Sequence, residues 1–126
     1  MTHDACLLRI FLSETARVDG HVAHEAIVLE ALRLKLAGAT VLRGVLGFGK
    51  SAHLHSAHLL SLSDDLPVIV EIVDSRENID RILPFVSQHV SSGLVTLEKA
   101  EVVHLAANKQ AGDDENNNSN DGSAAN

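Results

Sequence analysis

The sequence contains no tryptophan and no tyrosine, and it has only three phenylalanines. It also has no excess of positive charge, because 10 lysines and arginines stand against 17 aspartates and glutamates, which gives a net charge of −7. Proteins that bind nucleic acids need basic surfaces for the phosphates, and those that bind single strands stack the bases on aromatic rings. These two shortages argue against a nucleic-acid partner.

Cysteine and long apolar runs are also scarce. Cys6 is the only cysteine, so no internal disulfide can form, and its apolar neighbours predict a small core side chain rather than a catalytic thiol. No run reaches the roughly 18 apolar residues of a membrane span. The first residues lack the basic region of a signal peptide. We therefore expect a cytoplasmic protein without direct membrane insertion.

The C-terminal segment, residues 107–126, contains no apolar side chain larger than alanine. Such a segment cannot bury enough apolar surface to offset the entropy that it would lose on ordering. The sequence therefore predicts one folded domain over residues 1–106, followed by a disordered polar tail over residues 107–126.

Within the predicted domain, alternating or clustered apolar residues are typical of strands, and apolar residues at helical spacing are typical of helices. We expect Gly38 to end the first helix, Asp74 and Ser75 to cap the second, with Glu77 completing a capping box, and Pro84 to kink it. The predicted strands cover residues 6–12, 39–46, 59–62, 68–73 and 94–105, and the predicted helices cover residues 21–37 and 75–90.

This order predicts an α+β fold, the ferredoxin-like (βαββαβ) sandwich, with an elaborated loop between the two middle strands. Both helices would lie on one face of an antiparallel sheet and leave the other face open. Alternation places Arg9, Arg43 and Glu71 on that open face. The face is then either exposed to solvent or covered in an oligomer, and two apolar sides on the first helix favour an oligomer.

Residues 44–51 match the phosphate-loop pattern G-x-x-x-x-G-K-[ST], and the apolar run that ends at Asp74 resembles a strand with a magnesium-binding aspartate. An NTPase is therefore one alternative. A phosphate loop needs a parallel strand before it and a helix after it, whereas Gly44 is predicted inside the second strand. The same residues are otherwise a flexible hairpin tip or a ligand-binding loop, in which Lys50 and Ser51 could contact phosphate or carboxylate.

Three histidines in six residues, His53, His55 and His58, provide enough imidazoles for a transition metal. No regular helix or strand aligns all three, so exposed histidines are the other interpretation. His21, His24 and Glu25 at the first helix, and serines that have histidines near them only in sequence, give no basis for a catalytic site. We expect no enzyme activity.

Several motifs along the predicted domain, in order, resemble those of the PII-like proteins known as domain of unknown function 190, distant relatives of the nitrogen-regulatory PII signal-transduction proteins. The motifs are residues 25–28 (EAIV), 36–44 (LAGATVLRG), 47–49 (GFG), 62–63 (LS), 65–67 (DLP), 70–74 (VEIVD) and 93–96 (GLVT).

The resemblance implies a homotrimer whose sheets face the threefold axis. It also implies a cleft between neighbouring subunits, formed by Gly47-Phe48-Gly49 and by a loop that contains Gly93, where PII proteins hold an adenine nucleotide. PII proteins carry a lysine after the glycines of the second loop, whereas this chain has Leu94 and Val95. Relatives tend to have arginines where this chain has His53 and His58, which predicts weaker anion binding at pH 8 than at pH 6.

The sequence therefore predicts a PII-like regulatory protein that binds a small ligand, an adenine nucleotide or another anion, at trimer clefts. Residues 47–58 would relay ligand occupancy to a partner, which by analogy with PII proteins is a membrane transporter or channel. The alternatives are a metal-binding trimer that uses His53, His55 and His58, and an NTPase. The predicted ligand-binding residues are Arg43, Gly47, Phe48, Gly49, Lys50, Ser51, His55, Gly93 and Thr96.

Overall fold

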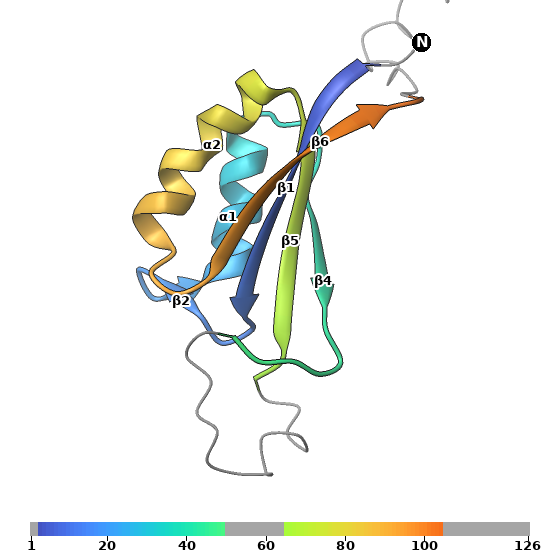
Figure 1. Cartoon of the computed structure of the whole chain (residues 1–126). Helices are drawn as coiled ribbons and strands as arrows, with labels where there is room; N and C mark the ends of the chain where they lie inside the picture. The colour runs from blue at the N-terminus through green and yellow to red at the C-terminus, as the bar shows by residue number, and fades with distance from the viewer. Residues whose placement is uncertain (1–2, 50–64, 105–126) are drawn as a thin grey trace, which may run out of the picture.

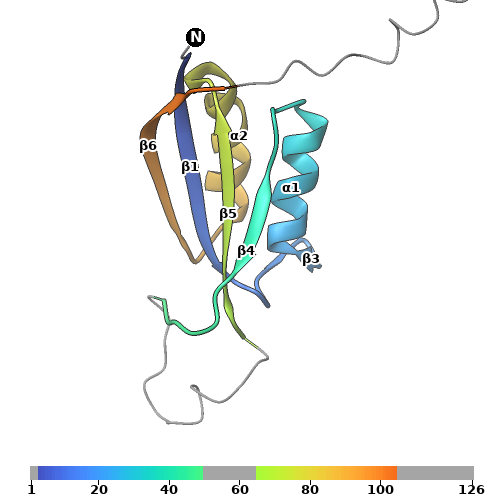
Figure 2. The same cartoon turned by 90° about the vertical axis from the view of Figure 1, so that its right-hand side faces the viewer.

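A four-stranded antiparallel sheet with two helices on one face forms the body of the chain (Figure 1). The computed structural model describes residues 3–49 and 65–104. The sheet order is β4-β5-β1-β6, and Figure 2 shows the strands side by side in that order. This is the predicted α+β, ferredoxin-like arrangement. The bounds are β1 His3–Ser13, β2 Arg17–Val18, β3 His21–Val22, α1 Ala23–Arg33, β4 Thr40–Arg43, β5 Pro67–Asp74, α2 Arg76–His89 and β6 Leu94–Val102.

Strand β1 lies in the centre of the sheet and fixes which side chains share a face. Arg9 lies opposite Glu71 of β5 and Thr96 of β6, so these three side chains point to the open face. The alternate residues Leu8 and Ile10 are fully buried beneath the helices. The predicted alternation along β1 is therefore confirmed.

The first helix is shorter than predicted. His21 and Val22 pair with Arg17 and Val18 in a small hairpin instead of starting the helix. At the other end the helix stops at the C-cap Leu34. Lys35 takes a left-handed backbone with φ 59, and its N–H donates to the Leu32 carbonyl at 3.0 Å. Lys35 thus holds the position predicted for Gly38, and that prediction was wrong.

The second helix, α2, begins at the predicted place. Ser75 is the N-cap, and its hydroxyl accepts a hydrogen bond from the Asn78 N–H at 3.2 Å. Asp74, predicted to share the cap with Glu77, instead lies in the last position of β5. The helix continues across Pro84 as one element. Its predicted apolar stripe packs on the sheet, with these residues buried: Ile79, Ile82 and Val86.

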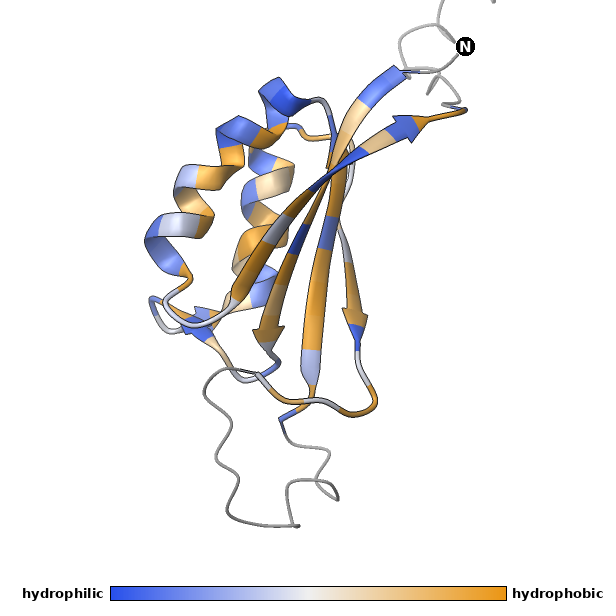
Figure 3. Ribbon diagram, in the orientation of Figure 1, coloured by the Kyte–Doolittle hydropathy of each residue, from blue (hydrophilic) through white to orange (hydrophobic). Residues whose placement is uncertain are grey.

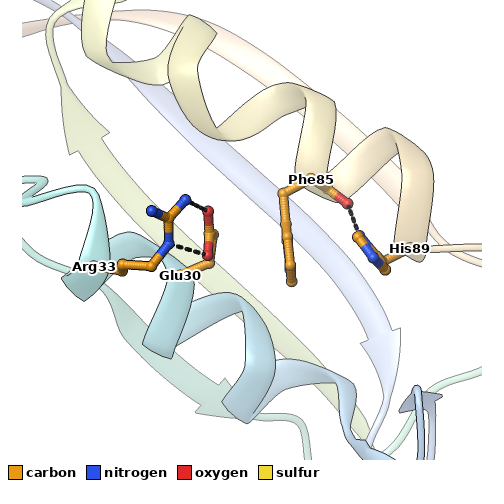
Figure 4. A network of polar contacts seen from close by, with 4 residues as sticks. All are labelled: Glu30, Arg33, Phe85 and His89. Carbon is orange, nitrogen blue, oxygen red and sulfur yellow. Dashed lines mark hydrogen bonds and ion pairs between the residues drawn. The ribbon is translucent and has the colours of Figure 1, made fainter.

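Each helix also carries polar contacts on the side near the other helix (Figure 4). Glu30 of α1 accepts two hydrogen bonds from Arg33, at 2.9 and 2.5 Å, and these bonds lower the pKa of the Glu30 carboxyl. On α2 the Phe85 carbonyl accepts a hydrogen bond from His89 Nδ1 at 2.9 Å, which requires that nitrogen to carry a proton. These hydrogen bonds therefore lie within each helix, and the Phe85 ring points from α2 toward α1.

Two predictions about the second strand were wrong. Strand β4 ends at Arg43, so Gly44 lies outside it, although the Gly44 N–H still donates to the Pro67 carbonyl at 2.7 Å. Arg43 pairs with Val68, whose side chain is buried beneath the helices, so Arg43 belongs to the helix-facing side and not to the open face with Arg9 and Glu71. The predicted strand over residues 59–62 and the predicted tail over residues 107–126 lie outside the described residues. In the parts of the chain that are described, neither helix is long and apolar enough to cross a membrane.

Candidate functional site

The chain leaves β4 through glycines that pack against Pro67, the first residue of β5. A Cβ atom at Gly44 would lie 2.8 Å from Pro67 Cγ, and one at Gly47 would lie 3.1 Å from it. Side chains at these positions would therefore displace the proline ring. A Cβ atom at Gly49 would meet nothing within 4 Å. The structure thus explains Gly44 and Gly47 by packing and leaves Gly49 open to contact from another molecule.

Apolar side chains near these glycines are exposed. Val45, Leu46 and Phe48 are 93%, 60% and 85% exposed. A cluster of three large apolar side chains on a surface is a feature of interaction sites. Phe48, a predicted ligand-binding residue, is therefore available for contact with a ligand or a second protein.

Gly93 belongs to the second predicted loop and lies just before β6. A Cβ atom there would lie 2.6 Å from the Phe11 carbonyl oxygen and 3.1 Å from Leu12 Cδ2. Any larger residue would force the β6 start away from β1. Thr96 follows on β6, opposite Arg9, and is half-buried on the open face.

The two predicted loops lie at the same end of the sheet, where the chain after β4 crosses the end of β5 toward β1 (Figures 1 and 2). Gly44 and Gly47 adjoin Pro67 at the start of β5, and Gly93 adjoins Phe11 near the end of β1. Pro67 and Phe11 belong to neighbouring strands, because β5 pairs with β1. The two sets of glycine contacts therefore lie on adjacent strands of one copy.

A polar cluster that the sequence did not predict lies at the same end. Arg43 forms an ion pair with Glu14, which follows β1. Asp65 accepts hydrogen bonds from the hydroxyls of Ser13 and, at 3.1 Å, Thr15. No sequence motif indicates these contacts, because the partners are 29 to 52 residues apart.

The open face has apolar and polar rows that cross all four strands. One row is apolar and contains Leu42, Ile69, Phe11 and Leu94, in order from β4 to β6. The next row is polar and contains Thr40, Glu71, Arg9 and Thr96. Within it Arg9 Nε lies 3.6 Å from Glu71 Oε2, and Arg9 also reaches Glu98 at 3.3 Å. Figure 3 shows hydrophilic positions in the middle of otherwise hydrophobic strands.

Two shallow surface hollows lie on the described part of the chain. One of about 510 Å³ is lined by Cys6, Arg76 and Lys99 among others, and one of about 390 Å³ is lined by Thr40 and Glu71 among others. Neither is lined by a predicted ligand-binding residue. Cys6 itself is buried, as predicted for a core side chain.

Asp74, the magnesium-binding residue in the NTPase alternative, is already engaged. Its carboxylate accepts hydrogen bonds from Ala37 N at 2.7 Å, Ser75 N at 2.7 Å and Asn78 Nδ2 at 2.9 Å. Partial burial raises the pKa of this carboxyl, but the hydrogen bonds outweigh burial and hold the pKa below its usual value. Asp74 also lies seven residues along β5 from Pro67, roughly 23 Å at strand spacing, so it is remote from Gly44.

Several predicted residues fall in the part of the chain that is not described. Lys50, Ser51 and His55 of the ligand-binding prediction, and His53 and His58 of the metal alternative, lie outside residues 3–49 and 65–104. Within those ranges no group of three or more histidine, cysteine, aspartate or glutamate side chains could hold a metal ion. Elsewhere His21 lies in β3 and His24 in α1.

Comparison with known proteins identifies the family. The model of DUF190, described as Uncharacterized ACR, COG1993, matches residues 5–102. A UPF0166 protein of Aquifex aeolicus (strain VF5) is 40% identical over 100 residues, which cover 79% of this chain and 93% of that protein. A UPF0166 protein of Methanocaldococcus jannaschii is 33% identical over 99 residues, which cover 78% and 91%.

Among solved structures, the chain is similar to CPII, a nitrogen regulatory PII-like protein from Thiomonas intermedia K12, in a structure bound to ADP, AMP and bicarbonate. The TM-score is 0.56 at 22% identity, over 82% of this chain and 92% of CPII. At that identity the likeness establishes the fold. The sequence motifs, the strand order and the family match agree: this chain has the fold of the PII-like protein CPII, and it belongs to the family DUF190, Uncharacterized ACR, COG1993.

Proposed function

We propose that this chain is a PII-like signalling protein that binds an adenine nucleotide or another small anion in clefts between the subunits of a homotrimer. The observation that carries the proposal is the fold shared with CPII, together with two glycine-containing loops at one end of the sheet. Gly47 adjoins Pro67 there, and Gly93 adjoins the Phe11 carbonyl. The resemblance to PII proteins implies that a ligand is held between the Gly47-Phe48-Gly49 loop of one copy and the Gly93 loop of its neighbour.

Such a contact joins two different surfaces of the chain, so it is heterologous, and with a rotation that closes it forms a ring rather than a twofold dimer. The open face supports this assembly. Its apolar row ends in Leu42 and Leu94, which are 46% and 59% exposed in one copy. Covering that row removes apolar surface from water, and this is the main favourable term in association. A threefold ring is the form that the family resemblance implies.

The ligand class follows from the chemistry at the β4 edge. Arg43 supplies a planar guanidinium suited to phosphate or carboxylate, and the glycine backbone permits close approach of a ligand. CPII, of the same fold, is bound to ADP, AMP and bicarbonate in one structure and to ADP, AMP and acetate in another, which supports an anionic ligand here. The described residues proposed for the site are Arg43, Gly47, Phe48, Gly49, Gly93 and Thr96.

The proposed role is regulatory rather than catalytic. The exposed side chains of Val45, Leu46 and Phe48 adjoin the proposed cleft, so a bound ligand would alter the surface that they offer to a partner. We propose that this partner is a protein such as a membrane transporter or channel, by analogy with PII proteins. The proposed domain spans residues 1–106, followed by a polar tail.

Subunit mixing tests the division of the site between copies. Arg43→Glu impairs the β4 side and Thr96→Glu impairs the β6 side, so each variant alone should bind ADP weakly in calorimetric titration. Co-expressed mixed trimers contain clefts in which both sides are wild type, and they should regain binding. Sedimentation of each sample checks that assembly is intact, and circular dichroism checks the fold.

Three results would contradict the proposal. A wild-type chain that is monomeric in solution would rule out a cleft shared between subunits. A wild-type trimer that binds none of ADP, AMP or bicarbonate would rule out the proposed class of ligand. Mixed trimers that fail to recover ADP binding, although both parents assemble, would show that one copy holds the site alone.

A further inference from the structure

Both ends of the connection from β4 to β5 are tied to the same short segment, residues 13–15, at the end of β1. Arg43, the last residue of β4, forms an ion pair with Glu14. Asp65, two residues before β5, accepts hydrogen bonds from the hydroxyls of Ser13 and Thr15. A backbone hydrogen bond also joins the same two segments, since the Glu14 N–H donates to the Leu66 carbonyl at 2.9 Å. Residues 13–15 therefore hold the two ends of the connection together.

The two ties differ in chemistry. At the β5 side the acceptor is a carboxylate and the donors are neutral hydroxyls, so an arriving anion would be repelled by Asp65. At the β4 side the donor is a guanidinium, which binds any carboxylate or phosphate that presents two oxygens. The Arg43 side chain is 65% exposed, whereas that of Glu14 is 21% exposed. Only the Arg43 tie is open to exchange with an anion from solvent.

We propose that Glu14 is an internal competitor for the anion site and thereby sets its affinity. This inference rests on the proposed function, because it takes Arg43 to be a ligand contact. Without ligand, the Glu14 carboxylate is paired with the Arg43 guanidinium. A bound phosphate or carboxylate takes the guanidinium in place of Glu14, so binding and loss of the Glu14 contact are one event.

This exchange also gives the β4 end two states. In the free protein Arg43 ties the end of β4 to the segment after β1. In the bound protein that tie is gone, whereas the hydrogen bonds from Ser13 and Thr15 to Asp65, and from Glu14 N to Leu66, remain. Occupancy would therefore loosen the connection at the β4 side only, next to the exposed Val45, Leu46 and Phe48.

A binding cycle tests the competition. Calorimetric titration with ADP is made on the wild type, Glu14→Gln, Arg43→Gln and the double variant, at low salt. Glu14→Gln should bind ADP roughly two- to fivefold more tightly than the wild type, the size expected for loss of an exposed ion pair. Arg43→Gln should bind less tightly. In the Arg43→Gln background the Glu14→Gln change should have no effect on ADP affinity, because the Glu14 carboxylate no longer has a guanidinium to pair with.

Two matched variants separate competition from simpler effects. Glu25→Gln removes the same charge from the start of α1 and should leave ADP affinity unchanged. Ser13→Ala removes the hydrogen bond from Ser13 to Asp65 and should also leave ADP affinity unchanged. An equal gain in Glu14→Gln and Glu25→Gln, or a gain that persists without Arg43, would overturn the inference while leaving the proposed function standing. A wild type that does not bind ADP would overturn both.

Discussion

The two faces of the sheet are made by the same strands and have different chemistry. On the helix-facing side Leu8, Ile10, Val70 and Ile72 are at most 1% exposed. On the open side the apolar row ends in Leu42 and Leu94, and the row beside it holds Arg9 and Glu71, with Arg9 also reaching Glu98 beyond that row. One copy of the chain completes the helix-facing core, whereas the open face still has apolar side chains to cover. Stability of the fold and assembly should therefore respond to different residues.

Two adjacent residues of β1 test this difference most strongly. Ile10→Ala removes a fully buried side chain and should lower the free energy of unfolding by about 2–5 kcal/mol. Phe11→Ala, its matched control on the open face, should change the unfolding free energy of one subunit less. It should instead weaken the oligomer, because Phe11 lies in the apolar row.

Chemical denaturation measures the first quantity, and sedimentation at several protein concentrations measures the second. Equal losses of subunit stability in the two variants, with the oligomer unchanged, would show that the open face is not an assembly surface. A loss of both quantities in Phe11→Ala would show that folding and assembly are coupled.

The second test concerns Gly93, where the two faces meet at the start of β6. Gly93→Ala places a Cβ atom 2.6 Å from the Phe11 carbonyl oxygen, so the backbone of β6 must shift. We expect a loss of about 1–3 kcal/mol in unfolding free energy, the range for overpacked sites. Gly38→Ala is the control, because a Cβ atom there meets nothing within 4 Å. Chemical denaturation of both variants measures their unfolding free energies. Similar free energies for the two variants would contradict the packing explanation of Gly93.

Much of the fold could be predicted because it depends on local patterns. Alternation along residues 6–12 identified the face of β1, and helical spacing identified the buried stripe of α2. Arg43 was assigned to the wrong face because strand pairing sets the register, and a shift of one residue exchanges the faces. The end of α1 was missed because Lys35 adopts a left-handed backbone that sequence patterns assign to glycine.

The candidate site was predictable only in part. Gly47 and Gly93 were predicted to contact a ligand, and the structure adds that Pro67 packs against Gly44 and Gly47 and that the Phe11 carbonyl lies against Gly93. The contacts of Glu14 and Asp65 could not be predicted, because they join segments that are distant in sequence and match no motif. Their positions follow from the pairing of β1 with β5, which brings Ser13 opposite Pro67.

The third test concerns Asp74, which ties the far end of β5 to Ala37 and to the start of α2. The pKa of its carboxyl is lowered in the folded state, so the ionised form stabilises the fold. That contribution is present above the unfolded pKa of about 3.9 and is lost as the pH falls through the folded pKa. Asp74→Asn should cost about 1 kcal/mol at pH 7.

Denaturation of the wild type and Asp74→Asn between pH 7 and pH 3 checks this expectation. The difference between them should stay constant down to about pH 5 and shrink below about pH 4. A difference that does not depend on pH would show that the carboxylate charge has no part in the tie. Either result leaves the open face unaffected, since Asp74 pairs with Cys6 on the helix-facing side.

The smallest expected effect concerns Arg9, in the polar row of the open face. Its ion pairs, at 3.6 Å to Glu71 and 3.3 Å to Glu98, join half-exposed and exposed side chains. Pairs of this kind contribute about 0–1 kcal/mol and weaken with salt. Arg9→Gln should therefore change the unfolding free energy of one subunit by less than about 1 kcal/mol at low salt, and by almost nothing at high salt.

The stability of the oligomer should respond differently to Arg9→Gln. Covering the open face removes water from Glu71, and in the variant the Glu71 charge is then buried without Arg9 to pair with it. A larger loss in dimer or trimer stability than in subunit stability, measured by sedimentation and denaturation at the same salt concentration, would show that assembly buries the polar row. Equal and small losses would place that row in solvent and limit the assembly surface to the apolar row beside it.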